Sequence, residues 1–126
     1  MLFRSAAVEL AALTADAELS NWAQQMSGRV VDAANNYGRF AASAGSLLLT
    51  MLDGPREVAI AAAPGSQIFK TAVRTTAPGA VVSWGSDLPL MAGRSAEEEL
   101  VYICRNFACD LPLSDLGQVS LSLGVR

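Results

Sequence analysis

The sequence predicts an α+β protein, with a helical segment in residues 1–53 followed by a small three-stranded α/β layer in residues 54–126. Two observations support this prediction. Apolar residues recur at spacings of three and four through residues 5–52, which is the period of an amphipathic helix. After Pro55, short runs rich in Val and Ile alternate with one helical stretch, in the order strand, helix, strand. The change of pattern at "DGP" (53–55) therefore predicts the boundary between the two parts.

Three helices are expected in the first part, packed antiparallel through short connections. The first is short, and Asp16 is expected to cap the second, because a carboxylate before a helix accepts hydrogen bonds from its free N–H groups. "ANNYG" (34–38) is predicted to end the second helix and "DGP" the third. The apolar positions are Ala7, Leu10, Ala11 and Leu13 in the first, Leu19, Trp22, Ala23, Met26, Val30 and Ala33 in the second, and Phe40, Ala44, Leu47, Leu48, Met51 and Leu52 in the third.

The second part is predicted to contain strands at 56–63, 80–84 and 100–104. A helix over 65–77, with Ser66 as its N-cap, separates the first two strands. Because a strand–helix–strand unit with short links makes its strands parallel, a small sheet of the parallel type is expected. A last helix is predicted over residues 114–123, capped by the hydroxyl group of Ser114.

Composition excludes several classes of function. The net charge is −3 and the nine Lys and Arg residues form no basic run, which argues against nucleic acid and against an anionic membrane surface as partners. No stretch reaches the roughly 18 to 20 apolar residues that a membrane span needs. Glu9 interrupts the apolar run near the N-terminus, which disfavours a signal peptide. A cytoplasmic location is therefore predicted, where cysteines are usually thiols.

The chain contains no histidine. This excludes a Ser-His-Asp triad, a Cys-His pair and a His-ligated metal within the chain. We therefore expect no catalytic residue, no cofactor site and no metal site, and no enzymatic activity of this chain by itself. "EEE" (97–99) is interpreted as a solvated charge run. The charged residues of "DGPRE" (53–57) are interpreted as parts of a turn and a strand.

The stretch "LVYICRNFACDLPLSD" (100–115) contains both cysteines, Cys104 and Cys109. Their C-x4-C spacing after a strand differs from the C-x-x-C motif at a helix start in thioredoxin-like proteins. Zinc sites usually need four ligands, and the chain offers two thiols. Two reduced, mostly buried thiols are the favoured interpretation. Two alternatives stay open, a reversible disulfide or redox role, and a metal shared with another chain or domain.

In "YICRNFACDLP", Tyr102, Cys104, Cys109 and Pro112 resemble the C-terminal signature of large thioredoxin domain-containing proteins of the spermatogenesis-associated protein 20 type. "SAAVELAALTADAEL", "DGPREVAIAA" and "LPLMAGR" resemble other segments of that family in the same order. The resemblance implies a parent with a thioredoxin-like domain and an (α/α)6 barrel similar to six-hairpin glycosidases and sugar epimerases. This chain would supply the terminal helices of the barrel and a C-terminal subdomain, without any catalytic residue.

Three hypotheses for function follow. In the first, the chain is a non-catalytic C-terminal fragment of such a protein, linked to carbohydrate metabolism or redox chemistry, and its partners are the rest of the barrel and the thioredoxin-like domain. In the second, it is a stand-alone module that self-associates through the exposed apolar helix faces around Trp22 and Leu48. In the third, Cys104 and Cys109 form a redox partner for the thioredoxin-like domain, which requires an exposed thiol with a lowered pKa.

Overall fold

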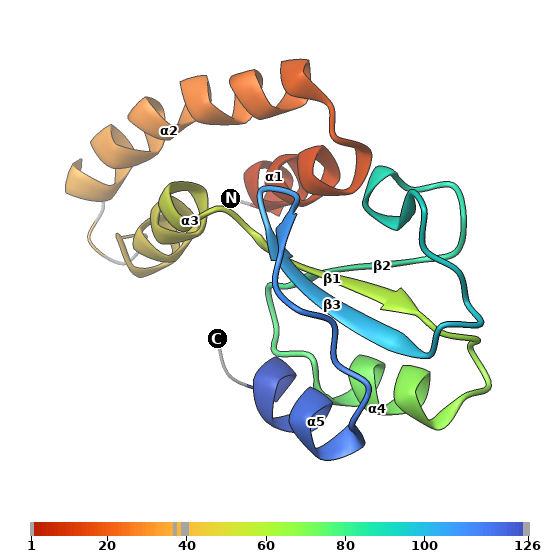
Figure 1. The fold of residues 1–126 in the computed structure, drawn as a ribbon. Coiled ribbons are helices and arrows are strands. Elements are labelled where there is room, and N and C mark those ends of the chain that lie inside the picture. Colours follow the sequence, from red (N-terminus) through yellow and green to blue (C-terminus); the bar gives the residue numbers. More distant parts are fainter. Residues whose placement is uncertain (1, 37, 39–40, 125–126) are drawn as a thin grey trace. The chain divides into compact units, whose positions relative to one another are not determined.

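The computed structural model describes residues 2–36, 38 and 41–124 of the chain. Within these residues, five α-helices accompany a four-stranded mixed sheet, which confirms the predicted α+β class (Figure 1). The chain divides into two compact units, Met1–Pro55 and Arg56–Arg126, so the division falls two residues after the predicted boundary. None of the described helices is both long enough and apolar enough to span a bilayer.

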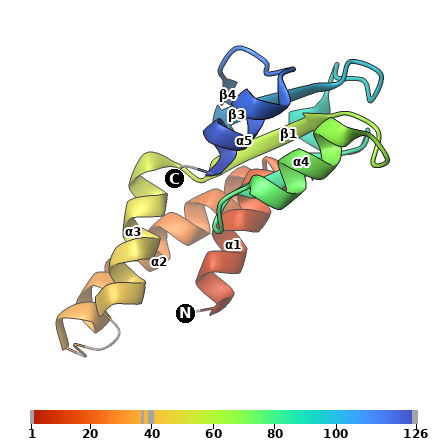
Figure 2. The ribbon, with the colours of Figure 1, turned by 90° about the horizontal axis from the view of Figure 1, so that it is seen from below.

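The first unit consists of α1 (Leu2–Thr14), α2 (Ala17–Asn36) and α3 (Ala41–Asp53), and α2 packs against both of the others (Figure 2). The predicted cap of α2 is confirmed, because Oδ1 of Asp16 accepts hydrogen bonds from the N–H groups of Glu18 and Leu19 at 2.8 and 3.1 Å. At the end of α3, Gly54 has a φ of 77°, the left-handed conformation that commonly ends a helix. Tyr37, in the predicted stop of α2, lies outside the described residues.

The core of the helical unit is narrower than the predicted apolar stripes. Alanine residues occupy much of this core. The helices therefore pack closely and leave some large side chains of the predicted stripes exposed. Trp22 is 46% exposed and Leu52 is 82% exposed, although both belong to the predicted apolar stripes. Phe40 and the side chain of Ala33 lie outside what the structure describes. The buried set is Val8, Ala23, Val30, Ala44 and Leu47, with Leu48 and Met51 packed against it.

All the strands found among the described residues lie in the second unit. In chain order its elements are β1 (Arg56–Ala61), α4 (Gln67–Thr75), β2 (Val81–Trp84), the 3-10 helix η2 (Pro89–Met91), β3 (Leu100–Arg105), β4 (Ala108–Cys109) and α5 (Leu116–Gly124). The sheet order is β2-β1-β3-β4. β1 and β2 are parallel and α4 connects them, which confirms the predicted strand–helix–strand unit.

The prediction of a three-stranded sheet of the parallel type was wrong in two respects. β3 pairs antiparallel with β1, and a fourth strand, β4, pairs antiparallel with β3. The link from β2 to β3 spans residues 85–99 but holds only η2, and it lacks the α-helix across one face of the sheet that usually makes a parallel return. The chain therefore reverses direction. The sequence did not reveal β4 because it is only two residues long.

Different elements pack against the two faces of the sheet. One face packs against α4 and α5, which lie side by side on it (Figures 1 and 2). The other carries small and polar residues and packs against η2. The first core is Val58, Ile60, Ala62, Ile68, Ala72, Val101, Val119 and Leu123; the second is Ala59, Ala61, Leu90, Met91 and Cys104.

Side chains cap both helices of the α/β unit. The predicted cap of α4 is confirmed, because Oγ of Ser66 accepts a hydrogen bond from the Phe69 N–H group at 3.2 Å. The predicted cap of α5 by Ser114 is wrong, since Oδ1 of Asp115 accepts from the Gln118 N–H group at 2.9 Å instead. A bridge between Val101 and residue 113 keeps the preceding chain extended, so the helix begins only at residue 116.

Candidate redox site at the β3–β4 hairpin

Cys104 and Cys109 form a disulfide bond with an S–S distance of 2.03 Å. The favoured interpretation of two separate thiols is therefore wrong in this structure, and the disulfide among the alternatives is what the structure contains. The two residues lie directly opposite each other on β3 and β4. They form a pair that shares no backbone hydrogen bonds, the position in an antiparallel ladder where side chains approach most closely.

A two-residue turn brings the cysteines together. Asn106 and Phe107 have φ angles of 49° and 62°, both in the left-handed region that a type I′ hairpin turn requires. Asparagine adopts this region readily, whereas a bulky aromatic residue rarely does. "NF" lacks the glycine typical of such turns, so neither the hairpin nor the cysteine pairing was apparent from the residue pattern.

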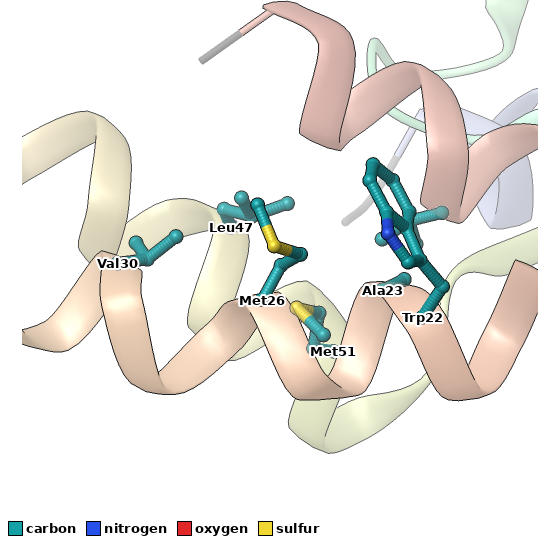
Figure 3. A pocket seen from close by; sticks show the side chains of 7 residues that line it. Trp22, Ala23, Met26, Val30, Leu47 and Met51 are labelled. Carbon is teal, nitrogen blue, oxygen red and sulfur yellow. The ribbon is translucent and has the colours of Figure 1, made fainter.

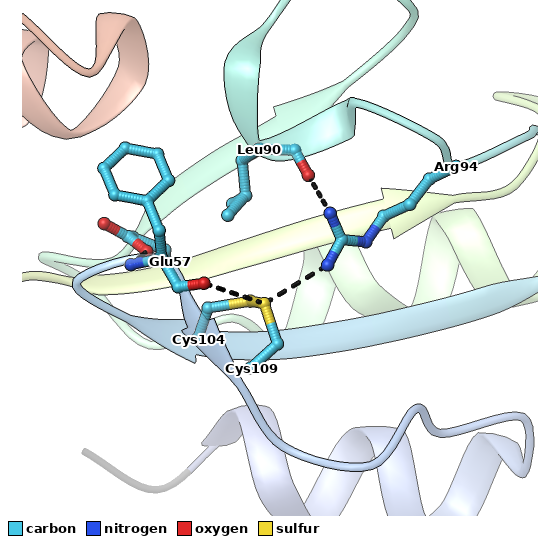
Figure 4. The surroundings of a disulfide bond; sticks show 6 residues. Glu57, Leu90, Arg94, Cys104 and Cys109 are labelled. Carbon is cyan, nitrogen blue, oxygen red and sulfur yellow. Dashed lines mark hydrogen bonds between the residues drawn. A yellow bond between two sulfur atoms is a disulfide. The ribbon is translucent and has the colours of Figure 1, made fainter.

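Glu57 lies beneath the hairpin. It is 1% exposed, and its register partner across the ladder is Cys104. Its Oε2 accepts a hydrogen bond from the Phe107 N–H group at 3.0 Å (Figure 4). Sequence reasoning missed this residue as a site group, although a single acidic residue within the apolar strand "REVAIA" was an available signal.

Burial raises the pKa of Glu57 by penalising its charged form, and the hydrogen bond from Phe107 acts in the opposite direction. The folded state therefore binds a proton at Glu57 more tightly than the unfolded chain does. The stability that this proton provides is fully present below the pKa of the unfolded chain, and it is lost as the pH rises through the folded pKa.

Arg94 brings a positive charge to the other half of the disulfide. Its Nη2 donates to Sγ of Cys109 at 3.3 Å, and its Nη1 donates to the Leu90 carbonyl oxygen of η2 (Figure 4). The guanidinium carbon lies 4.3 Å from the centre of the Tyr102 ring, within the range of a cation–π contact. A cation at a sulfur atom stabilises the thiolate that forms when a disulfide is reduced.

The predicted charge run at 97–99 is solvated, because all three glutamates are exposed. Glu98 makes a local contact, since its Oε2 accepts a hydrogen bond from the Tyr102 hydroxyl group at 3.1 Å. Desolvation raises the pKa of Tyr102, and the hydrogen bond and negative charge of Glu98 raise it further. The carboxylates do not converge on one point, and the described residues contain no group of three or more Cys, Asp or Glu side chains that could hold a metal ion.

The two cysteines differ in access to solvent. Cys104 is 1% exposed, whereas Cys109 is partly exposed near the hairpin tip. The Phe107 carbonyl oxygen lies 3.9 Å from Sγ of Cys109, a simple contact because a disulfide sulfur has no proton to donate. A thiolate approaching this bond would therefore meet the Cys109 sulfur first.

The helical unit has one notable surface feature among its described residues, a shallow apolar depression (Figure 3). It is too tight to hold a water molecule, so it is a contact surface rather than a ligand cavity. Its lining residues are Val8, Trp22, Ala23, Met26, Val30, Leu47 and Met51.

The chain matches no protein family model, no curated protein and no solved structure. The resemblance to the spermatogenesis-associated protein 20 type therefore rests on the sequence frame around Tyr102, Cys104, Cys109 and Pro112 and on the order of the other segments.

Proposed function

We propose that the α/β unit carries a thiol–disulfide exchange pair, in which Cys109 is attacked by the thiolate of a partner and Cys104 leaves. The observation that carries this proposal is the asymmetry of the disulfide. One sulfur belongs to a buried residue, and the other belongs to a partly exposed residue in contact with the Arg94 guanidinium group.

The exchange proceeds in two steps with a partner dithiol. First, a partner thiolate attacks Sγ of Cys109, a mixed disulfide forms, and the Cys104–Cys109 bond breaks with Cys104 as the leaving thiolate. Second, the other thiolate of the partner attacks the partner sulfur of the mixed disulfide and releases Cys109 as a thiolate. Arg94 favours the second step, because its charge stabilises that thiolate. The pair gains two electrons and the partner becomes a disulfide.

The family resemblance supports a partner of the thioredoxin-like class. In a protein of the spermatogenesis-associated protein 20 type, the N-terminal thioredoxin-like domain would supply the dithiol, and the helical unit here would be the end of the (α/α)6 barrel. Any carbohydrate chemistry would belong to the parent, because the sequence predicts no catalytic residue for it in this chain. We place the exchange in the cytoplasm, where disulfides are usually transient and serve catalysis or redox sensing.

The proposal is tested by trapping. Oxidised protein is incubated with a thioredoxin whose resolving cysteine is replaced by serine, and the mixed disulfide is located by peptide mass spectrometry. We expect the adduct on Cys109, because the attacking thiolate reaches that sulfur first. The reduced Cys109→Ser variant, reacted with the same thioredoxin activated as a mixed disulfide with a small thiol, is expected to react far more slowly than reduced Cys104→Ser. An adduct on Cys104, or none on either cysteine, would contradict the proposal.

A second candidate function is self-association through the helical unit. It is favoured by the exposure of large apolar side chains there, since Trp22 is 46% exposed and lines the apolar depression with Met26 and Met51 (Figure 3). Contiguous exposed apolar surface commonly marks a protein–protein contact.

If the helical unit self-associates, Trp22→Gln should shift the protein towards monomer, because burial of the indole ring would contribute much of the contact energy. Sedimentation equilibrium over a concentration series measures this shift. Gln25→Ala, at an exposed position on α2, is the matched control and should behave like the wild type. A wild-type protein that stays monomeric at every concentration would rule the candidate out.

A further inference from the structure

Reduction of this disulfide creates a chemical problem at Cys104. Attack on Cys109 leaves the negative charge on the sulfur of Cys104, a residue that is 1% exposed. An isolated charge in a buried position is strongly unfavourable unless it is paired or neutralised by a proton. The Arg94 guanidinium group donates to the Cys109 sulfur, at the other end of the bond. The reaction therefore needs a proton source beside Cys104.

Glu57 lies where such a source is needed. It is the register partner of Cys104 on the neighbouring strand, so the two side chains project from the same face of the sheet. Directly paired residues of antiparallel strands have Cβ atoms about 4.5–5.5 Å apart, so rotation of the Glu57 side chain away from Phe107 would bring its carboxyl group to the sulfur. In Figure 4 the carboxyl group of Glu57 lies at the Phe107 backbone, to one side of the disulfide. Both residues are 1% exposed, so bulk water competes little for the proton.

We propose that Glu57 donates a proton to Cys104 when the disulfide is reduced and takes it back when the disulfide re-forms. This inference rests on the proposed exchange function and assigns its proton carrier. During reduction, the Cys104–Cys109 bond breaks, the electron pair stays on the Cys104 sulfur, and the carboxyl proton moves to that sulfur. The products at this position are a neutral thiol and a carboxylate. During oxidation, Cys109 first forms a mixed disulfide with the partner by attacking the partner's disulfide. The carboxylate of Glu57 then removes the thiol proton of Cys104, the Cys104 sulfur attacks Sγ of Cys109, and the partner leaves as a thiolate.

The surroundings of Glu57 suit both states of the carboxyl group. Burial raises its pKa and so favours the acid form that donates the proton. The Phe107 N–H group, which already donates to Oε2, then stabilises the carboxylate that remains after transfer. A carboxylic acid is a stronger acid than a thiol, so the transfer to a buried thiolate is favourable.

The charged groups nearest in sequence and register face elsewhere. Arg56 precedes Glu57 on β1 and projects from the opposite face, where its guanidinium group donates to the Ser122 carbonyl oxygen of α5. Arg105, the register partner of Arg56, follows Cys104 and projects from that same opposite face. On β2, the register partner of Glu57 is Val81, an apolar residue. Arg94 is the cation that the structure places on the same face of the sheet as Glu57, where its guanidinium group contacts Cys109.

The test is the pH profile of disulfide reduction by dithiothreitol, expressed as a rate constant per dithiothreitol thiolate. Wild-type protein should show a rate constant that falls as the pH rises through the pKa of Glu57, because the acid form is lost. Glu57→Gln keeps an oxygen acceptor for the Phe107 N–H group but has no proton to transfer. Its rate constant should be about tenfold lower at the acid end and independent of pH, since general acid catalysis contributes at least this much. Glu97→Gln, at an exposed position, should follow the wild type.

Equal pH profiles for the wild type and Glu57→Gln would overturn the assignment of Glu57. The trapping experiment would be unaffected by that result, so a Cys109 adduct together with equal profiles would refute this inference and leave the exchange function standing. If Glu57→Gln does not fold, infrared difference spectra of oxidised and reduced wild-type protein decide the question. Reduction should remove the band of a protonated carboxyl group, and a spectrum without this loss would overturn the proposal.

Discussion

Ile60→Ala is expected to lower the free energy of unfolding of the α/β unit by about 3 kcal/mol, a typical cost for truncating a buried isoleucine. Ile60 is 1% exposed and lies on β1, one of the two inner strands of the sheet. It belongs to the core between the sheet and α4 and α5. The truncation would leave a cavity that these elements can close only in part, so the loss includes packing as well as transfer from water.

The measurement is urea unfolding followed by the fluorescence of Trp84, in a Trp22→Phe background that removes the other indole. Trp84 reports on the α/β unit because its ring makes an edge-to-face contact with Phe69 of α4, with ring centres 5.6 Å apart. Leu121→Ala on α5 is the control, since Leu121 is 76% exposed and its truncation should cost less than about 0.5 kcal/mol. Equal losses in the two variants would refute the placement of Ile60 in the core.

Reduction of the Cys104–Cys109 disulfide should lower the free energy of unfolding by about 2 kcal/mol. The cysteines are five residues apart, so the bond closes a short loop and restricts the unfolded chain less than a long-range crosslink would. The folded hairpin keeps other contacts after reduction, including the hydrogen bond from the Phe107 N–H group to Glu57. The fold should therefore persist in the reduced protein, as an exchange cycle requires.

The test compares urea unfolding of the wild type with and without reductant, after thiol titration has confirmed the redox state. The Cys104→Ala/Cys109→Ala variant is the control for effects of the reductant itself, and its unfolding midpoint should not change. A wild-type midpoint that is the same in both redox states would show that the disulfide contributes no stability.

Local features of the fold were predictable because their causes are local. The caps at Asp16 and Ser66 depend on one side chain and on N–H groups two or three residues away. The unit formed by β1, α4 and β2 follows from a change of hydrophobic period and from short links. In contrast, the direction of β3 depends on whether residues 85–99 form a crossover helix or a loop. The hydrophobic period of the sequence does not reveal which of the two forms.

In the candidate site, too, some residues could be recognised from the sequence, whereas the contacts between them could not. The cysteines were recognisable as candidates from the sequence, but their bond depends on a turn in which Phe107 takes a left-handed conformation that aromatic residues rarely adopt. Glu57 is 47 positions before Cys104 in the chain, and only the register of β1 against β3 makes them neighbours. Arg94 reaches Cys109 because η2 supplies a carbonyl oxygen that holds its guanidinium group.

The α+β class, the positions of most helices and the change of architecture near Pro55 could be predicted from the amino-acid pattern, because hydrophobic period and helix caps act over a few residues. The mixed sheet, the disulfide and the burial of Glu57 opposite Cys104 became visible only in the folded protein. These features depend on which distant residues face each other across the ladder, and strand register is set by the packing of the whole sheet.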